Sequence, residues 1–413
     1  MNNQFDVAII GAGPSGAVAS ALLNKQGFKV CVLEKQHFPR FVIGESLLPH
    51  CMEMMAEAGL LEAVQAEPSF QFKNGAAFTW GARYTYFDFT DKFSPGPGTT
   101  FQVRRAAFDK ILIDEAAKQG VEVRFGHGVT EFDNSGEHAR LQVAPDNGTA
   151  YELTARFVLD ASGYGRVLPR LLDLEEPSDL PPRMAHFTHI EDNISSPKFD
   201  RNKILISTHP VHRDVWLWTI PFGDNRCSIG VVGTPEKLAG DAETVLKRFA
   251  LEVPLLAEVL DKAVWENEMP FRSIEGYSAN VKSLYGKHFA LLGNASEFLD
   301  PVFSSGVTVA MHSAKLAADL LTKQLKGGQA DWQTEFAAPL MVGVNAFRTY
   351  VTGWYEGSFQ DVIYAADRNH DIRRMICSIL AGYAWDTENP YVAKSDRRLA
   401  TLAELVGKAQ MEV

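Results

Sequence analysis

The sequence predicts an α/β fold in three parts: a first domain with a parallel sheet, an inserted domain with an antiparallel sheet, and a helical C-terminal region. Three observations support this prediction. A strand, glycine turn, helix and strand open the chain, alternating strand-like runs fill its middle, and helical periodicity dominates its end. A chain of 413 residues also exceeds one ordinary core of about 100 to 200 residues, so more than one domain is expected.

The opening unit begins with FDVAII (Phe5–Ile10), an apolar run rich in β-branched residues, as buried strands are. GAGPSG (Gly11–Gly16) follows it directly, and a helix-like segment then extends to Gly27. KVCVLE (Lys29–Glu34) has the composition of a second buried strand that ends on an acid. This order of elements is that of the βαβ unit that binds dinucleotides.

Each glycine of the turn has a physical role. Gly11 allows the tight turn, Gly13 lets the backbone approach a pyrophosphate, and Gly16 permits close packing of helix on strand. The helix N-terminus offers free N–H groups and a positive dipole end to the phosphates. Glu34 is placed to accept hydrogen bonds from ribose hydroxyls. We therefore predict a Rossmann-like dinucleotide-binding domain, although this motif alone does not separate FAD from NAD.

The middle of the chain contains strand-like runs that alternate apolar and polar residues, as in a sheet with one packed face. These runs are Arg83–Phe89, Tyr151–Leu159, Arg183–Ile190, Lys203–Thr208 and Arg226–Val232. From Glu236 onward helical periodicity dominates, and the aromatic stripe from Tyr350 to Tyr364 is assigned to packing between helices rather than to a pocket. The predicted parts are residues 1–80, 101–175 and 270–328 for the first domain, 81–100 and 176–269 for the inserted substrate domain, and 329–413 for the helical region.

Composition excludes several classes of partner and site. Lys and Arg number 40 against 51 Asp and Glu, and the net charge of −11 repels phosphate backbones and anionic lipids, so neither nucleic acid nor a membrane is expected as partner. No secretory leader precedes the first strand and no run approaches about 20 apolar residues, so the expected location is cytoplasmic. The four cysteines show no CxxC or Cys/His spacing, which argues against a disulfide framework or a metal site.

Three later segments resemble FAD-dependent aromatic hydroxylases. FQVRRAAFDKIL (Phe101–Leu112) resembles their Arg-x-x-Phe-Asp element, FVLDASGYGR (Phe157–Arg166) their buried Asp-x-x-Gly turn, and the segment from His288 to Ala314 their Gly-Asp segment beside the flavin. The resemblance implies an FAD-binding domain in which FAD, rather than NAD, is the cofactor. The residues that it assigns to FAD are Arg105, Asp160, Asn294, Asp300 and Gly306. Asn294 stands where the family usually carries Asp, so the role of binding the ribitol is expected to shift to Asp300 or to be weaker.

The segment FPRFVIGESLLP (Phe38–Pro49) resembles both flavin-dependent halogenases and geranylgeranyl-reductase-like flavoproteins. By this resemblance Arg40 would neutralise the FAD pyrophosphate and Ser46 would lie near the isoalloxazine ring. A surface arginine without a specific contact is the alternative for Arg40. Because both groups share the segment, it does not choose between them.

A tryptophan motif distinguishes the halogenases. In VWLWTIPF (Val215–Phe222) a strand would place Trp216, Trp218 and Ile220 on one face, since side chains alternate. The run resembles the Trp-x-Trp-x-Ile-Pro motif of flavin-dependent halogenases, which is proposed to wall the substrate off from the flavin. Ordinary packing between sheet and helices is the alternative use of such a pair.

A second halogenase-like segment is FLDPVFSSG (Phe298–Gly306), which is similar to a pattern of halogenases that act on phenols and pyrroles. By this resemblance the amides of Ser305 and Gly306 would bind halide, beside Ser304, in an anion-binding turn at a helix N-terminus. The same amides are alternatively expected to hold a flavin carbonyl. Phe303 replaces a glutamate of the tryptophan halogenases, which favours the phenol, pyrrole or carrier-bound branch.

The third halogenase-like segment is FQFKNGAAFTWG (Phe70–Gly81), in which Lys73 lies among aromatic residues in an otherwise uncharged stretch. Partial desolvation would lower its pKa. Lys73 resembles the lysine with which halogenases hold hypohalous acid or form a haloamine. A solvated loop lysine is the alternative.

The leading prediction is therefore a flavin-dependent halogenase. Reduced FAD, O2 and halide (chloride or bromide) would give hypohalous acid, which Lys73 would direct to an electron-rich aromatic substrate, free or bound to a carrier protein. A separate flavin reductase is an expected partner, since only one GxGxxG is present. The alternatives are a monooxygenase or geranylgeranyl-reductase-like enzyme without halogenation, and a non-catalytic FAD-binding protein.

Overall fold

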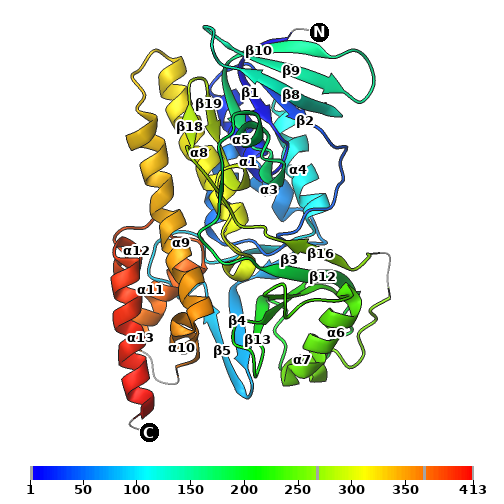
Figure 1. The fold of residues 1–413 in the computed structure, drawn as a ribbon, viewed down its shortest axis with the longest axis vertical. Coiled ribbons are helices and arrows are strands. Elements are labelled where there is room, and N and C mark those ends of the chain that lie inside the picture. Colours follow the sequence, from blue (N-terminus) through cyan, green and yellow to red (C-terminus); the bar gives the residue numbers. More distant parts are fainter. Residues whose placement is uncertain (1–2, 267–268, 366–368, 412–413) are drawn as a thin grey trace.

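The computed structural model describes residues 3–266, 269–365 and 369–411. It places one sheet in the upper half of the molecule, a second sheet in the lower half, and the C-terminal helices along one side of both (Figure 1). The predicted α/β class, with a helical C-terminal region, is thereby confirmed.

The first sheet has the strand order β18-β19-β10-β1-β2-β7, and β9 and β8 extend it from β10. The five strands from β19 to β7 are parallel. One face of these strands packs on helices, and the other face packs on residues of β9. Its strands are β1 (Gln4–Ile10), β2 (Val30–Glu34), β7 (Glu122–Phe125), β8 (His127–Asp133), β9 (Ala139–Pro145), β10 (Tyr151–Asp160), β18 (Tyr285–Gly286) and β19 (Phe289–Leu291).

Helices of the first half lie close to the parallel strands, with α1 packed against both α4 and α8. Because α1 follows the glycine turn and α8 follows β19 at the same end of the sheet, both helix N-termini lie next to the cavity described below. The helices of this half are α1 (Pro14–Lys25), α2 (His50–Ala58), α3 (Leu61–Gln65), α4 (Arg105–Lys118), α5 (Val167–Leu171) and α8 (Gly306–Leu325).

The second sheet has the order β16-β12-β15-β14-β13-β4-β5. All its pairs are antiparallel except β13 with β4, which are parallel because the chain between them crosses the other half of the molecule. Its strands are β4 (Gly75–Trp80), β5 (Arg83–Asp88), β12 (Met184–Glu191), β13 (Lys203–Thr208), β14 (Trp216–Pro221), β15 (Arg226–Gly233) and β16 (Arg272–Glu275). The predicted boundary at residue 80 therefore falls between two strands that pair in one sheet.

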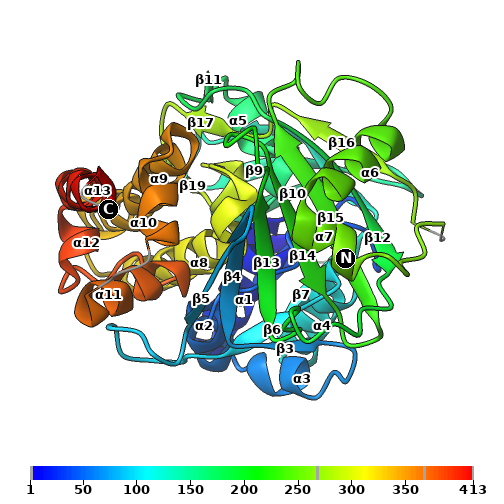
Figure 2. The same cartoon turned by 90° about the horizontal axis from the view of Figure 1, so that it is seen from below.

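Helices α6 (Ala242–Glu252) and α7 (Pro254–Val259) lie on one side of this sheet, away from the C-terminal helices (Figure 2). Two small sheets complete the fold, β3 (Gln71–Lys73) with β6 (Thr100–Gln102) and β11 (Glu175–Pro177) with β17 (Ala279–Val281). The prediction that helical periodicity dominates from residue 236 missed β16, β17 and β18, because these strands have only two to four residues each.

The C-terminal region is helical, as predicted, and buries its aromatic stripe partly between helices and partly against the second sheet, where Tyr364 contacts Thr79 and Trp354 contacts Phe78. Tyr350, Trp354, Phe359 and Tyr364 are core residues, which confirms the packing interpretation for them. The helices are α9 (Ala338–Glu356), α10 (Ser358–Tyr364), α11 (His370–Leu380), α12 (Pro390–Ala393) and α13 (Ser395–Met411).

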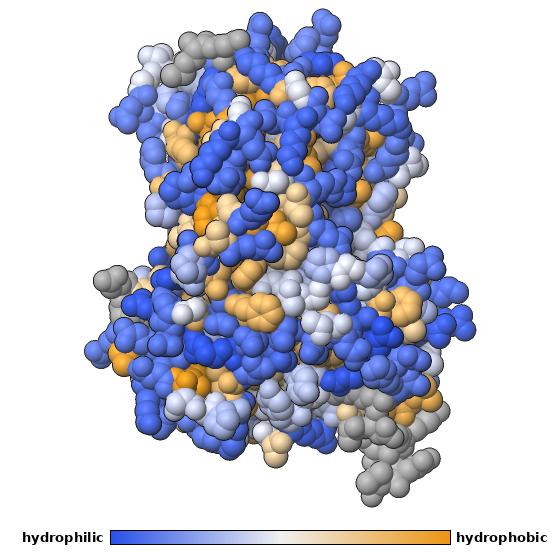
Figure 3. Space-filling view, turned by 180° about the vertical axis from the view of Figure 1, so that it is seen from behind, coloured by the Kyte–Doolittle hydropathy of each residue, from blue (hydrophilic) through white to orange (hydrophobic). Residues whose placement is uncertain are grey.

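The face shown in Figure 3 is mostly hydrophilic over both halves, and apolar groups gather at the waist between them. Among the described residues, no helix combines the length and apolar character needed to cross a bilayer. All four cysteines are buried free thiols.

Candidate active site

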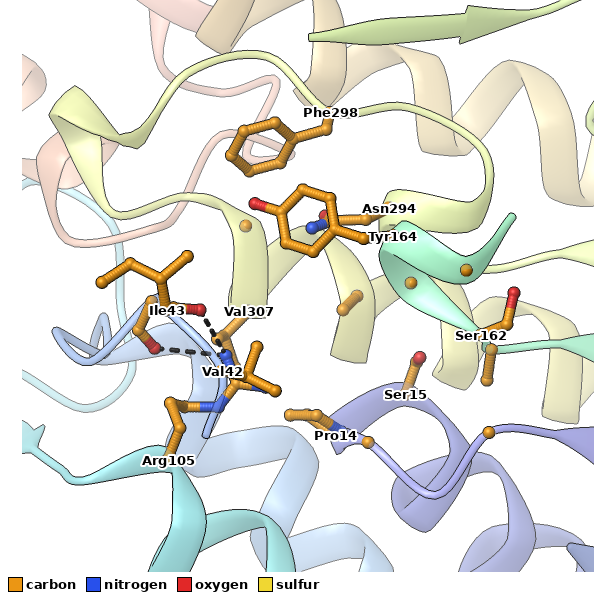
Figure 4. A pocket seen from close by; sticks show the side chains of 18 of the residues that line it. Pro14, Ser15, Val42, Ile43, Arg105, Ser162, Tyr164, Asn294, Phe298 and Val307 are labelled. Atoms are coloured by element: carbon orange, nitrogen blue, oxygen red, sulfur yellow. Dashed lines mark hydrogen bonds between the residues drawn. The ribbon is translucent and has the colours of Figure 1, made fainter. Parts of the chain in front are cut away.

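A cavity of about 650 Å3 extends from the glycine turn after β1 to the inner face of the second sheet. Figure 4 shows its middle part, where the rings of Tyr164 and Phe298 lie next to each other near Asn294, in an edge contact with centroids 5.5 Å apart. The predicted site residues that line it are Gly11, Gly13, Glu34, Arg40, Ser46, Arg105, Trp216, Trp218, Asn294, Ser304 and Gly306. Five predicted residues, Gly16, Lys73, Asp160, Asp300 and Ser305, lie outside the set of described residues that line this cavity.

The glycine turn fits a dinucleotide. A Cβ atom on Gly16 would lie 2.0 Å from the carbonyl oxygen of Gly11, so only glycine allows this helix to approach the turn. Gly11 itself has a φ of +100°, a left-handed conformation that glycine adopts without strain. Gly13 lines the cavity at the N-terminus of α1, where free N–H groups favour phosphate.

Glu34 ends β2 at the cavity wall, as predicted. Its Oε2 accepts a hydrogen bond from the backbone N–H of Ala12 (2.9 Å), and its Oε1 accepts one from that of Gln36 (2.8 Å). A carboxylate has further acceptor positions beyond these two. Glu34 therefore holds the glycine turn and keeps free acceptor positions at the cavity wall.

Glu34→Ala is expected to weaken FAD binding by more than about 10-fold, because the variant loses the ribose acceptor and the bond that orders Ala12. Titration of the apoprotein with FAD, followed by flavin fluorescence, measures the change. Glu131→Ala, which removes an exposed carboxylate from β8, serves as the control. An affinity equal to that of the wild type would remove Glu34 from the binding site.

Two arginines share one buried carboxylate behind the cavity wall. Asp109 accepts from Arg40 Nη1 (3.0 Å) and from Arg105 Nε and Nη2 (2.7 and 3.0 Å). Arg105 Nη1 donates to the carbonyls of Ile43 and Gly44 (3.1 and 3.3 Å), which fixes the segment beside Ser46 (Figure 4). Arg40 lies next to Gly13, with Nη2 3.7 Å from the position of a Cβ there, so it is placed to neutralise a pyrophosphate.

Asp160 is fully buried and supports the wall from behind. Its carboxylate accepts from the backbone N–H groups of Ser162 (2.9 Å) and Leu168 (2.6 Å). Ser162 and the following Tyr164 line the cavity. Asp160 therefore orders the turn that faces a ligand.

The loop before α8 brings Asn294, Ser304 and Gly306 to the cavity. Ser304 has a φ of +56°, and Ser305 is the N-cap of the 20-residue helix α8. A second, much smaller cavity of about 10 Å3 is lined by residues that include Ser305, Gly306 and Phe298. Its size is that of one water molecule or small ion.

The tryptophan motif forms the far wall. Trp216, Trp218 and Ile220 line the cavity, whereas Leu217 packs in the core beneath α6, so the predicted alternation of faces is confirmed. Trp218 lies across Gly230 of β15, where a Cβ would come within 2.2 Å of its ring. Its Nε1 donates to Ser228 Oγ (3.1 Å), and the ring is therefore held flat against the sheet.

A hydrogen-bonded chain ties Trp216 to Asp300. Trp216 Nε1 donates to Tyr355 Oη (3.0 Å), and Tyr355 Oη donates to Asp300 Oδ2 (2.8 Å). Asp300 is 2% exposed, and its Oδ1 accepts from Val302 N–H (2.9 Å) at the start of a 3-10 turn. Asp300 thus connects the tryptophan wall to the loop that carries Ser304, and its carboxylate is already engaged rather than turned toward a ribitol chain.

Burial raises the pKa of Asp300 to about 6, against an ordinary value near 4. The folded protein therefore holds this proton more tightly than the unfolded chain does. We expect the free energy of unfolding to fall as the pH rises from about 4 to 6, by ~3 kcal/mol from this group.

Asp300→Asn is expected to remove that part of the pH dependence. Urea unfolding at pH 4, 5, 6 and 7 measures it, with Asp261→Asn, an exposed carboxyl, as the control. If the free energy of unfolding changed with pH in the same way in the wild type and in Asp300→Asn, the pH dependence would not come from Asp300.

Lys73 ends β3 and is 0% exposed. Its Nζ donates to Ser46 Oγ (2.7 Å) and to the carbonyl of Leu47 (2.7 Å), and it lies 5.4 Å from the centroid of the Phe89 ring. Burial lowers the pKa of Lys73 to about 7. The predicted desolvation is therefore present, and the solvated-loop alternative is wrong, but Ser46 lies between the amine and the cavity.

Sequence reasoning missed several residues of the site. Tyr164 and Phe298 lie inside motifs that were recognised, so their aromatic character was an available signal. Glu45 and His189 form a hydrogen bond across 144 residues of sequence, and Tyr355 reaches Trp216 from α9. No local pattern marks these contacts, because each depends on the packing of distant elements.

Comparison with known proteins supports the interpretation of the cavity as an FAD site. Residues 4–333 match the family model described as "FAD binding domain". A 1H-pyrrole-2-carbonyl-[peptidyl-carrier protein] chlorinase of Pseudomonas fluorescens is 27% identical, over 98% of this chain and 94% of the relative. A tryptophan 2-halogenase of Chondromyces crocatus is 32% identical, over 80% of this chain and 63% of the relative. A crystal structure described as a flavoprotein/dehydrogenase from Cytophaga hutchinsonii has a TM-score of 0.94 at 45% identity, covering 98% of this chain and 100% of the other.

Proposed function

The chain belongs to the FAD-binding-domain family that includes the flavin-dependent halogenases, and from this premise we propose that it halogenates an electron-rich aromatic compound. It is an FAD-dependent oxidoreductase. The observation that carries the proposal is the position of Trp216 and Trp218, which line the same cavity as the glycine turn and the loop before α8.

In this proposal Trp216 and Trp218, in the cavity wall, keep FAD and the aromatic substrate apart. The cofactor, when bound and reduced, supplies the activation of O2 that oxidises halide to hypohalous acid. Gly11, Gly13, Glu34 and Arg40 hold its adenosine and pyrophosphate end. The two tryptophans then separate the flavin from the substrate, so that oxygen itself is not transferred to the ring.

Halide binds at the amides of Ser305 and Gly306 in this proposal. Both residues line the small cavity at the N-terminus of α8, where the N–H groups and the helix dipole favour an anion. The cavity volume of about 10 Å3 is the minimum for one water molecule, so the loop before α8 has to move slightly to admit the larger chloride or bromide. Phe303, at the position before Ser304, is buried against Trp354 and Phe359. The carboxylate that does line the small cavity belongs to Glu297, which accepts from Arg348 (2.7 Å).

Lys73 is the proposed partner of the electrophilic halogen, reached through Ser46 Oγ at the cavity wall. In the substitution step a ring carbon forms its bond to the halogen of hypohalous acid, and the halogen–oxygen bond breaks. The ring loses its proton, and the oxygen leaves as water. Because Lys73 does not itself line the cavity, this proposal requires the contact of its amine with Ser46 Oγ to open. The amine, whose pKa burial lowers to about 7, then donates a hydrogen bond to that oxygen or, when neutral, accepts the halogen.

The substrate we propose is a phenol or pyrrole, free or tethered to a carrier protein. The chlorinase relative acts on a pyrrole-2-carbonyl group on a peptidyl-carrier protein, and it matches this chain over nearly its whole length. A separate flavin reductase would supply reduced FAD, because the described elements include one GxGxxG turn, after β1.

The test combines purified protein with a flavin reductase, NADH, FAD, O2 and either bromide or chloride. A panel of phenols and pyrroles, free and as carrier thioesters, is screened by mass spectrometry for halogen isotope patterns. Halogenated product that depends on halide and on the protein supports the proposal. Its absence across the panel, in protein that binds FAD, would contradict it.

The second candidate is a flavin-dependent monooxygenase or reductase without halogenation. The flavoprotein/dehydrogenase relative at 45% identity favours it, as does the position of Lys73 behind Ser46. Turnover of substrate in the complete absence of halide would establish this candidate.

A further inference from the structure

The wall of the small cavity at the N-terminus of α8 contains a carboxylate. Glu297 is 8% exposed and lines this cavity together with Ser305 and Gly306, whose amides are the proposed halide ligands. Phe298 and Gly306 also line the large cavity, so an ion in the small one would lie beside the FAD site. An anionic side chain in the wall of an anion site is unfavourable unless a cation compensates its charge.

The compensating cation is Arg348 of α9. Its Nη2 donates to Glu297 Oε2 (2.7 Å), and Glu297 is its one ion-pair partner among the described residues. Arg348 lies one helical turn after Val344, which lines the same small cavity. Its Nη1 is buried and has no hydrogen-bond partner among the described residues. No other described carboxylate therefore shares the charge of this guanidinium.

The other charged groups that face Glu297, among the described residues, are Arg166 and Asp179 from the segment between β10 and β12. Arg166 is engaged by Glu175 (3.0 Å) and by three backbone carbonyls, and Asp179 adds a second negative charge. Burial raises the pKa of Glu297, and Arg348 opposes this rise more strongly than Arg166 does. Arg348 is therefore the main source of compensation.

This compensation matters for an anion in the small cavity. Two unit negative charges in one cavity repel each other strongly, because the protein interior screens charge less than water does. An uncompensated Glu297 would therefore oppose halide at the amides of Ser305 and Gly306. Paired with Arg348, the carboxylate adds no net charge, and the positive end of the α8 dipole is left to attract the anion.

We propose that the pair of Glu297 and Arg348 sets the affinity of the halide site, with Arg348 acting through Glu297 rather than on the halide itself. This inference rests on the proposed function in that it takes the amides of Ser305 and Gly306 as the halide position. It makes Arg348 a positioning residue, and it gives α9, a helix of the C-terminal region, a role in halide binding.

The test measures chloride binding without turnover. Oxidised holoenzyme is titrated with chloride in a buffer whose other anion is gluconate, and the line width of the chloride NMR signal reports binding. The titration is made at about pH 8, far above the ordinary pKa of a carboxyl group. Arg348→Gln is expected to weaken chloride binding by at least about 10-fold, because it leaves the carboxylate uncompensated. Glu297→Gln is expected to strengthen it by about 3-fold or more, because it removes the repelling charge and keeps an acceptor for Arg348.

The opposite signs separate compensation from a structural role. Both substitutions remove the same ion pair, so a structural role would move the chloride affinity in the same direction in both. The double variant with Glu297→Gln and Arg348→Gln is expected to bind chloride within about 3-fold of the wild type, because neither charge remains. A double variant as weak as Arg348→Gln would show that Arg348 is itself a halide ligand, and would overturn the proposal.

The matched control is Lys323→Gln. Lys323 lies in the last turn of α8, at the other end of the helix from the small cavity, and its Nζ donates to Glu335 (2.6 Å). This variant also loses one positive charge from an ion pair, and its chloride affinity should equal that of the wild type. Weaker binding by both Arg348→Gln and Glu297→Gln, or wild-type affinity in both, would overturn the proposal. If Arg348→Gln does not fold, the sign of the change in Glu297→Gln decides.

The two proposals fail in distinguishable ways. Opposite effects of Arg348→Gln and Glu297→Gln on chloride binding, without halogenated product in the turnover assay, support the pair and contradict halogenation. Halogenated product, with a chloride affinity that neither substitution changes, supports the enzyme and overturns the role of the pair.

Discussion

Lys73→Met is expected to reduce halogenated product by at least about 100-fold while FAD binding and the halide-dependent oxidation of reduced FAD persist. Methionine keeps an unbranched side chain of similar length in a site that is already fully buried. The amine that bonds to Ser46 is lost, and with it the group proposed to direct the electrophilic halogen. Product yield by mass spectrometry and flavin oxidation by absorbance separate the two steps.

The matched control for this variant is Lys92→Met. Lys92 is also buried, and its Nζ donates to the carbonyls of Ser94 and Gly96, away from the described cavity wall. Lys73→Arg should fail as well, because a guanidinium stays protonated. Substantial halogenation by Lys73→Met would show that the lysine only supports Ser46.

The wild-type pH profile gives an independent readout. Burial lowers the pKa of Lys73 to about 7, and the neutral amine is the form that accepts a halogen. Product formation at saturating substrate is therefore expected to rise as the pH increases through about 7. A flat profile between pH 6 and 8 would favour a role for Lys73 as hydrogen-bond donor to Ser46 alone.

Trp218→Ala is expected to raise the ratio of hydroxylated to halogenated product by about 10-fold or more. The change removes a ring that lies flat over Gly230 in the cavity wall, and it opens a path between flavin and substrate. Loss of a buried Trp also costs about 3 to 5 kcal/mol of stability, so the ratio is measured in protein shown to be folded. Chromatography with mass detection quantifies both products.

Two further variants locate the cause of this effect. Trp218→Phe keeps a wall and should stay close to the wild-type ratio. Trp332→Ala removes a buried tryptophan that stacks on Phe157 outside the described cavity wall, so it matches the loss of packing alone. If Trp218→Ala and Trp332→Ala gave the same ratio of hydroxylated to halogenated product, the tryptophan motif would contribute core packing only.

Local patterns were sufficient for the adenosine end of the site. The glycine turn and Glu34 lie where the sequence predicts, because their roles follow from one βαβ unit whose parts are contiguous. The alternation of Trp216, Trp218 and Ile220 likewise depends only on strand geometry.

The other end of the site depends on tertiary packing. The sequence predicts that Lys73 is desolvated. It does not predict that Ser46 lies between Lys73 and the cavity, because that contact joins two separate segments. It identified Asp300 as a replacement for the charge missing at Asn294. The 3-10 turn instead engages that carboxylate with Val302 and Tyr355. The hydrogen bond that Glu45 accepts from His189 joins the two halves of the molecule, and no local sequence pattern predicts it.

The order of strands in the first sheet also determines which strand pairs can form early during synthesis of the chain. β1 pairs with β2, which is synthesised soon after it, but its other partner β10, and β19 beyond β10, are synthesised much later. Such long-range pairing slows folding. The glycine turn is among the first segments translated, whereas Tyr355, which anchors Trp216, is among the last. A nascent chain released before α9 would therefore carry every residue of the turn and still have a tryptophan wall without its tyrosine anchor.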